Sequence, residues 1–136
     1  MNMRLRFLDA ASAAAPDLVL ANDTDVESIA GALDGVASIA LDFPKWVDGR
    51  AYSQARLLRS RYRFRGEIRA TGEVVADMMP LLFRTGFDAV VLRAGEDRSV
   101  AERALGFFPD GHYQADVGEP LPRFRRAGDS ATGRPQ

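Results

Sequence analysis

Side chains that could bind an anion follow the apolar runs between residues 42 and 93. Guanidinium groups offer paired donors to phosphate, sulfate or carboxylate, and the free N–H groups at a helix start add partial positive charge. The same arginines could instead pair with neighbouring aspartates and hold loops in place, and no glycine-rich phosphate loop accompanies them. The anion-binding candidates are Arg50, Arg69, Thr71 and Arg93.

Carboxylates occur in the same stretch. They could act as a general base, pair with the arginines or supply oxygen ligands to Mg²⁺. Only Asp42 closely follows an apolar run, whereas Glu73 and Asp77 stand four residues apart, a spacing that fits a solvated helix face. We therefore expect no metal site. The candidates for acid–base or pairing roles are Asp42, Asp48 and Asp77.

Positive charge is concentrated in residues 45–69, which hold one lysine and seven arginines but only two acids. Three of these arginines, at spacings of three and four residues, would form a stripe on one helix face. Such a stripe could dock an acidic protein or simply face solvent. The isoelectric point of 5.8 and the lack of a recognisable nucleic-acid-binding motif argue against nucleic acid. The partner-docking candidates are Arg56, Arg59 and Arg63.

Composition excludes several classes of function. The 136 residues include no cysteine, which excludes disulfides, a cysteine nucleophile and cysteine-ligated metal clusters. Ser53 and Thr71 lack a nearby base because the only histidine is His112, so no catalytic residue is assigned. No nucleotide fingerprint occurs, and the cofactor stays unknown. Without a signal-peptide pattern or an apolar run of about 20 residues, we expect a cytoplasmic protein with no membrane contact.

Alternating apolar runs and helix-period segments must position these side chains. The apolar runs predict strands, and Thr24, Thr71 and Ser99 are expected to cap helices. Gly35 and Gly86 should end helices, and Pro80 should kink or shorten the helix that contains it. The predicted strands are 18–20, 37–41, 67–70, 87–92 and 112–115, and the predicted helices are 25–33, 50–62, one that follows Thr71 and ends before Gly86, and 99–105.

This order predicts an α/β fold of repeated β-α units in a small, mainly parallel sheet with helical crossovers. The sheet would be a half-barrel or doubly wound, because the chain is half as long as a full barrel of about 250 residues. We expect one domain over 1–120 and an extended arm with a flexible tail over 121–136. In a parallel sheet the strand ends near Asp42, Arg69 and Arg93 should share one edge. A homodimer would cover the open edges of a half-barrel.

Several motifs occur in order: FPKWVDGRAYS at 43–53, ARLLR at 55–59, RGEIRATG at 65–72, Asp77, and RTGFD at 84–88. With these motifs the chain resembles the bacterial domain-of-unknown-function 934 family over most of residues 18–115. The resemblance implies an oxidoreductase or accessory role in assimilatory sulfite reduction, with sulfite reductase or another sulfate-assimilation protein as partner. Thr85 stands where family members often have cysteine, so thiol redox chemistry is not expected at that position.

Three functions stay open. The first is an accessory protein of sulfite reduction that binds an anion or docks on a reductase. The second is a small half-barrel enzyme acting on an anionic metabolite, with Asp42 or Asp48 as base and Arg50 and Arg69 as clamps. The third is a structural interaction module.

Overall fold

The computed structural model describes residues 5–105. Within them five strands form a single parallel sheet in the order β1-β5-β4-β3-β2. The predicted α/β fold with a parallel sheet is confirmed. The expected strand at 112–115 and the expected arm at 121–136 lie outside the described residues. The strands are β1 (Arg6–Phe7), β2 (Leu18–Leu20), β3 (Ser38–Phe43), β4 (Glu67–Gly72) and β5 (Ala89–Val90).

Helical segments connect the strands. None in the described part of the chain is long and apolar enough to cross a membrane. The α-helices are α1 (Val26–Ile29), α2 (Arg50–Arg56), α3 (Met79–Thr85) and α4 (Arg98–Leu105), with short segments η1 (Ala30–Ala32), η2 (Leu57–Arg61, a π-helix) and η3 (Ala76–Met78).

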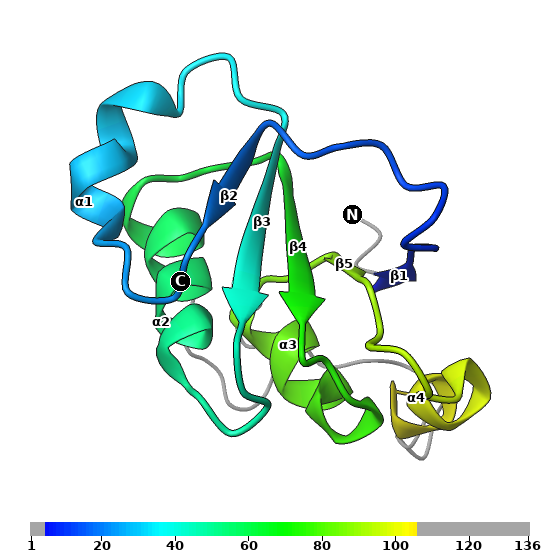
Figure 1. The fold of residues 1–136 in the computed structure, drawn as a ribbon. Coiled ribbons are helices and arrows are strands. Elements are labelled where there is room, and N and C mark those ends of the chain that lie inside the picture. The colour runs from blue at the N-terminus through cyan, green and yellow to red at the C-terminus, as the bar shows by residue number, and fades with distance from the viewer. Residues whose placement is uncertain (1–4, 106–136) are drawn as a thin grey trace.

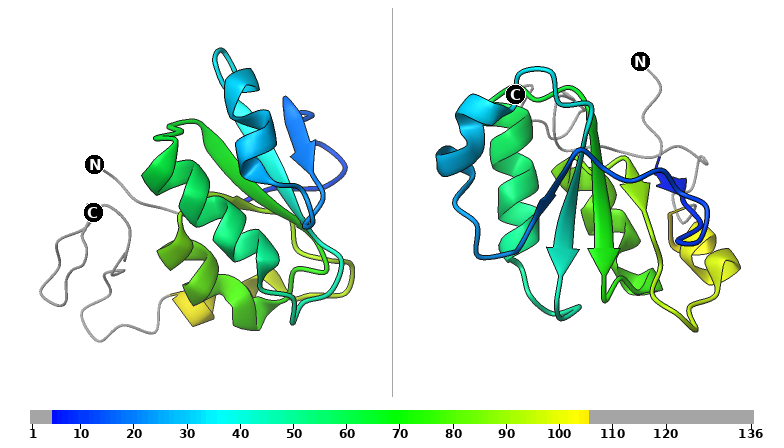
Figure 2. Two further views of the ribbon diagram at one scale, coloured as in Figure 1. Left: turned by 90° about the vertical axis from the view of Figure 1, so that its left-hand side faces the viewer. Right: turned by 45° about the horizontal axis from the view of Figure 1, so that its top comes forward.

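The chain winds in one direction from β2 to β5, since each strand is the neighbour of the next. Right-handed crossovers that advance in one direction place their helices on one face of a sheet. Figures 1 and 2 show α2 and α3 on the same side of the sheet, behind the strands in the view of Figure 1. The winding from β2 to β5 therefore corresponds to the half-barrel alternative. β1, which the sequence analysis missed, pairs with the far side of β5.

The core lies between the sheet and these helices. Alternate residues of β3 point toward the helices, and Ile39, Leu41 and Phe43 are fully buried there. The Phe43 ring packs 5.1 Å from the ring of Tyr52 in α2 and 5.8 Å from that of Phe87 before β5. Each such buried side chain stabilises the fold by roughly 2 kcal/mol. This packing fixes α2, and with it the loop that enters α2, against the end of β3.

The opposite face of the sheet carries the polar positions of β3 and β4. Asp42 lies opposite Thr71 in register, and Arg69 lies between Ala40 and Ala89. The β1–β2 connection, residues 8–17, is tied to this face because Arg69 Nη1 donates to the Ala14 carbonyl oxygen at 2.8 Å. The connection is therefore anchored beside Arg69, two residues before Thr71 along β4.

Two strands are longer than predicted and one is shorter. β3 and β4 continue to Phe43 and Gly72, which pair with each other, so Thr71 lies in a strand and does not cap a helix. β5 covers only Ala89–Val90 of the expected 87–92. Its ladder nevertheless extends on both sides, because Asp88 N donates to Ile68 O and Val91 N donates to Ala70 O.

The helix ends also differ from the prediction. Pro80 does not kink α3 but lies in its first turn, where its missing N–H needs no partner. Asp25, rather than Thr24, caps α1, and Asp97 accepts the Ser99 N–H at the start of α4. Gly86 ends α3 with a φ of 109°, as expected for a left-handed cap.

The predicted helix 50–62 is divided. It is α-helical to Arg56 and then π-helical to Arg61. Arg63 follows outside the helix with a φ of 57°. It therefore does not share a regular helix face with Arg56 and Arg59.

Candidate functional site

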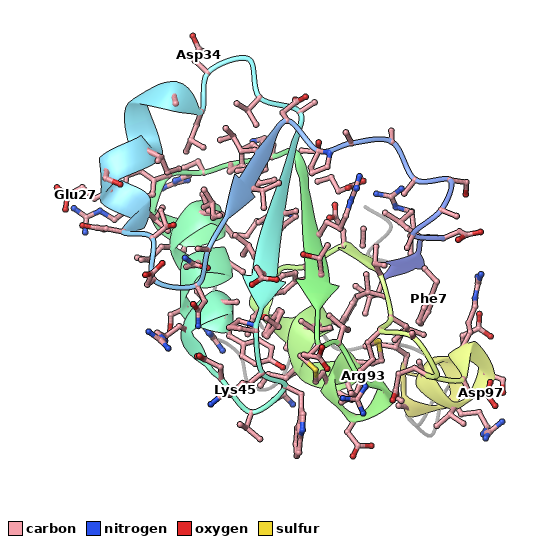
Figure 3. All side chains as sticks on the ribbon, in the orientation of Figure 1. Phe7, Glu27, Asp34, Lys45, Arg93 and Asp97 are labelled. Carbon is pink, nitrogen blue, oxygen red and sulfur yellow. The ribbon has the colours of Figure 1, made fainter. Side chains whose placement is uncertain are left out.

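The carboxyl ends of the strands share one edge, as the sequence predicted. Because all pairings are parallel, the segments after β3, β4 and β5 leave the sheet on the same side. Figure 3 shows Lys45 and Arg93 at this edge, toward which the strand arrows point. Arg69 lies elsewhere, because it is in the middle of β4. We use the term carboxyl edge for the last residues of β3 and β4 together with the segments that follow β3, β4 and β5: residues 42–50, 71–73 and 91–96.

Arg50 is bound by its own loop. Its Nη2 lies 2.9 Å from Asp48 Oδ2, and its backbone N donates to Asp48 Oδ1 at 2.9 Å. Asn22 Nδ2 also donates to Asp48 Oδ2, at 2.6 Å. The side-chain hydrogen bond from Arg50 is the main cause that lowers the pKa of Asp48 and raises that of Arg50. The pair closes the turn into α2 and joins it to the loop after β2.

Arg93 is also paired. Its Nη1 lies 3.1 Å from Glu73 Oε1 and its Nε lies 3.4 Å from Glu96 Oε2. The hydrogen bond to Glu73 is the main cause that raises the pKa of Arg93. Glu96 uses its other oxygen to accept the Ala76 N–H at 2.9 Å. Arg93 thus connects the loops that follow β4 and β5.

Arg69 is the most deeply buried of the three arginines, with 7% of its surface exposed. Its Nε and Nη2 both lie 2.7 Å from Glu67 Oε2, and Arg6 Nη2 binds Glu67 Oε1 at 2.8 Å. Burial acts to raise the pKa of Glu67, but the hydrogen bonds from the two arginines outweigh it and the pKa is lowered. Arg69 therefore joins β4 to the β1–β2 connection.

The remaining candidates, Thr71, Asp42 and Asp77, make fewer contacts than the three arginines. Thr71 Oγ1 lies 3.4 Å from the Leu41 carbonyl oxygen. Neither Asp42 nor Asp77 forms a hydrogen bond or ion pair with a side chain of the described residues. Among residues 5–105 no three His, Cys, Asp or Glu side chains gather in a group that could hold a metal ion.

The predicted arginine stripe contains two kinds of arginine. Arg59 is largely buried and donates to three carbonyl oxygens: Gly86 at 2.9 Å, Phe64 at 3.0 Å and Gly66 at 2.8 Å. Its Nη2 also lies 3.5 Å from Asp88 Oδ2. Burial lowers the pKa of Arg59 and raises that of Asp88. Arg59 clamps the loops that enter β4 and β5, so its guanidinium is already occupied.

The other arginines between residues 56 and 65 are exposed and have no carboxylate partner among the described residues. They are Arg56, Arg61, Arg63 and Arg65. Leu57, which is 40% exposed, directly follows Arg56 and stands four residues before Arg61. No sequence pattern singled out Leu57 as a surface residue, although it lies off the apolar side of the helix to which Leu58 belongs. Arg61 stacks over the Tyr62 ring at 5.6 Å. We call this the basic surface: Arg56, Leu57, Arg61, Arg63 and Arg65.

Two further exposed apolar residues lie in the loop between β3 and α2. Trp46 is 51% exposed and Val47 is 68% exposed. The loop is held by the Asp48 N–H, which donates to the Lys45 carbonyl oxygen at 3.1 Å. Two large apolar side chains in a turn between a strand and a helix were the sequence signal for this feature. We call Lys45, Trp46 and Val47 the edge loop.

Comparison with known proteins identifies a family. No curated protein and no solved structure matches the chain. The model of a family described as "Bacterial protein of unknown function (DUF934)" matches residues 17–124, more than half of the chain. This match agrees with the motifs at 43–53 and 65–72. The chain therefore belongs to the DUF934 family of bacterial proteins.

Proposed function

We propose that this protein is an accessory protein of assimilatory sulfite reduction that docks on an acidic surface of the sulfite reductase through the basic surface. The pathway comes from the family resemblance. The docking role rests on one observation: residues 56–65 carry four exposed arginines without a carboxylate partner among the described residues, together with an exposed leucine.

Free guanidiniums and an apolar centre suit a protein interface. Arginine is enriched in interfaces because its flat, weakly hydrated group gives up water readily and binds carboxylates with two donors. An exposed leucine provides apolar area for a partner to bury. Complementary charge would also speed the encounter with an acidic partner.

The carboxyl edge supports an anion site less well. Arg50 and Arg93 already bind carboxylates of their own chain, and Arg69 is buried against Glu67. An incoming sulfite or phosphate would have to compete with these carboxylates for the same guanidiniums. The alternative of a small enzyme acting on an anionic metabolite needs Arg50 and Arg69 as clamps, and both guanidiniums are occupied.

Co-purification with the sulfite reductase of the same bacterium tests the proposal. Arg56→Glu with Arg61→Glu reverses two charges on the basic surface. Arg98→Glu with Arg103→Glu reverses two charges on α4, where both arginines are exposed. We expect the first pair to abolish co-purification and the second to preserve it, with both variants folded by circular dichroism. Equal retention of the reductase by both variants contradicts the proposal.

A further inference from the structure

The edge loop lies at the opposite end of α2 from the basic surface. α2 begins at Arg50, beside the carboxyl ends of the strands, and the chain that leaves η2 returns to the amino end of β4. Figure 1 shows the β3–α2 loop at the bottom of the molecule and the chain between α2 and β4 crossing at the top. A partner bound to the basic surface would therefore leave Trp46 and Val47 exposed.

Charge around the edge loop is unevenly satisfied. The neighbouring ions Arg50 and Arg93 each have carboxylate partners within the chain. Lys45 and Asp42 have no ion-pair partner among residues 5–105. They stand only three residues apart and carry opposite charges. The unpaired charges at this edge are thus one positive and one negative, so two copies of the edge are complementary to each other.

Such a set fits a second copy of the same surface. In a two-fold contact, residue i of one subunit meets residue j of the other, and j meets i. Lys45 of each copy can then bind Asp42 of the other, which gives two ion pairs in all, one on each side of the axis. Trp46 and Val47 would lie between them as the apolar centre, where interfaces concentrate their binding energy, and tryptophan is among the residues most enriched there.

We propose that the chain forms a two-fold homodimer through the edge loop, with reciprocal Asp42–Lys45 ion pairs around Trp46 and Val47. This interface goes beyond the proposed function, because it uses a different surface and leaves the basic surface of each subunit open. A homodimer would present two basic surfaces at its outer ends, and either proposal can fail without the other.

The position of Trp46 makes the test direct, because it is the only tryptophan of the chain. Analytical ultracentrifugation over a range of concentrations measures the monomer–dimer equilibrium, and Trp46 emission is followed over the same dilutions. We expect dimers whose dissociation on dilution shifts the emission to longer wavelength. A monomer at every concentration overturns the proposal, as does a dimer whose Trp46 emission is independent of dissociation.

Variants identify the surface. Trp46→Ser should raise the dimer dissociation constant at least about tenfold, the range expected for the loss of a central interface residue. Val100→Ser is the matched control, because Val100 is 40% exposed on α4. An unchanged dimer in Trp46→Ser, or an equal weakening in Val100→Ser, contradicts the assignment.

A charge exchange tests the ion pairs. Lys45→Asp and Asp42→Lys should each weaken the dimer, and the double variant should restore it because the reciprocal pairs form again with the signs exchanged. If Asp42→Lys fails to fold, Lys45→Glu and Lys45→Met provide the second measurement, with Lys45→Glu expected to weaken the dimer more. No restoration in a folded double variant, or equal dimers in both Lys45 variants, contradicts the pairing. If the chain is a monomer and Trp46 emission shifts only when sulfite reductase is added, the edge loop binds that partner. This result overturns the homodimer.

Discussion

The carboxyl edge and the basic surface are both rich in arginine, but they use it in opposite ways. At the carboxyl edge, Arg50 and Arg93 bind carboxylates that come from their own or neighbouring loops. On the basic surface, Arg56 and Arg61 face solvent without a carboxylate partner among the described residues. The two arginines at the edge that fold considerations favour for ligand binding are therefore neutralised within the chain, and the arginines free for a partner lie at the other end of α2.

The contrast extends to single residues of one helical segment. Arg56 and Arg59 are three residues apart, yet Arg56 is exposed whereas Arg59 is largely buried and donates to the carbonyl oxygens of Gly66 and Gly86. An arginine stabilises the fold where other parts of the folded chain place hydrogen-bond acceptors within its reach. Residue type and spacing alone therefore do not separate the arginines that build the fold from those that are free to bind.

The largest expected effect distinguishes these two arginines. Arg59→Ala removes donors from three carbonyl oxygens and leaves Asp88 without its cation. We expect it to lower the free energy of unfolding by about 3 kcal/mol, whereas exposed Arg56→Ala should change it by less than about 0.5 kcal/mol. Chemical denaturation of both variants measures the difference. Similar stabilities would show that Arg59 does not clamp the strand entries.

A glycine at the carboxyl edge gives the next effect. Gly72 has a φ of 94°, and a Cβ there would lie 2.5 Å from the Phe43 carbonyl oxygen and 2.7 Å from Asp42 Oδ1. Gly72→Ala should therefore cost about 2 kcal/mol, from strain and steric overlap together. Gly95 has a similar φ of 90° but open space around it, so Gly95→Ala should cost about 1 kcal/mol. Equal melting temperatures for the two variants would contradict close packing at the ends of β3 and β4.

The ion cluster around Glu67 should give a pH-dependent effect. Its pKa in the folded chain lies below the ordinary value of 4.5, so its stabilisation is present above that value and is lost as the pH falls through the folded pKa. Glu67→Gln should therefore lower the free energy of unfolding by about 1 kcal/mol at neutral pH. In acid it should change almost nothing, because protonated Glu67 is uncharged, as the glutamine is. Denaturation curves from pH 7 down to pH 3 measure this. A constant difference across that range would argue against ionic pairing with Arg6 and Arg69.

The smallest effect is expected for anions at the carboxyl edge. Since Arg50 and Arg93 are paired, sulfate, sulfite or phosphate should raise the melting temperature by less than about 1 °C over chloride at equal ionic strength. Differential scanning fluorimetry provides the comparison. A larger rise that disappears in Arg50→Ala would establish an anion site and reverse our assessment of the two regions.

Much of the fold can be predicted from sequence because the spacing of apolar residues distinguishes strands from helices. The alternation of apolar runs with helix-period segments predicts the parallel sheet, and Gly86 marks the end of α3. The position of Arg69 was missed because the polar residues of β4 belong to the face opposite α2 and α3, and such residues resemble the end of an apolar run. β1 was missed because two residues give no periodicity.

The two roles of the arginines could not be read from sequence for a different reason. The partners of Arg59 are mainly backbone carbonyl oxygens, which every residue type has. Its burial also depends on a π-helix that shifts residues 57–61 from the regular helical spacing. The pairing of Arg50 with Asp48 was foreseen as an alternative because both lie in one short turn. That of Arg93 with Glu73 depends on the neighbouring positions of β4 and β5.

Calorimetric titration of the purified chain with sulfite reductase tests the central claim most directly. Arg56→Gln with Arg61→Gln and Arg50→Gln with Arg93→Gln each remove two positive charges, the first pair from the basic surface and the second from the carboxyl edge. We predict that the basic-surface variant binds at least about tenfold more weakly than wild type and that the carboxyl-edge variant stays within about threefold. Weaker binding by the carboxyl-edge variant, with wild-type affinity in the other, would contradict the account.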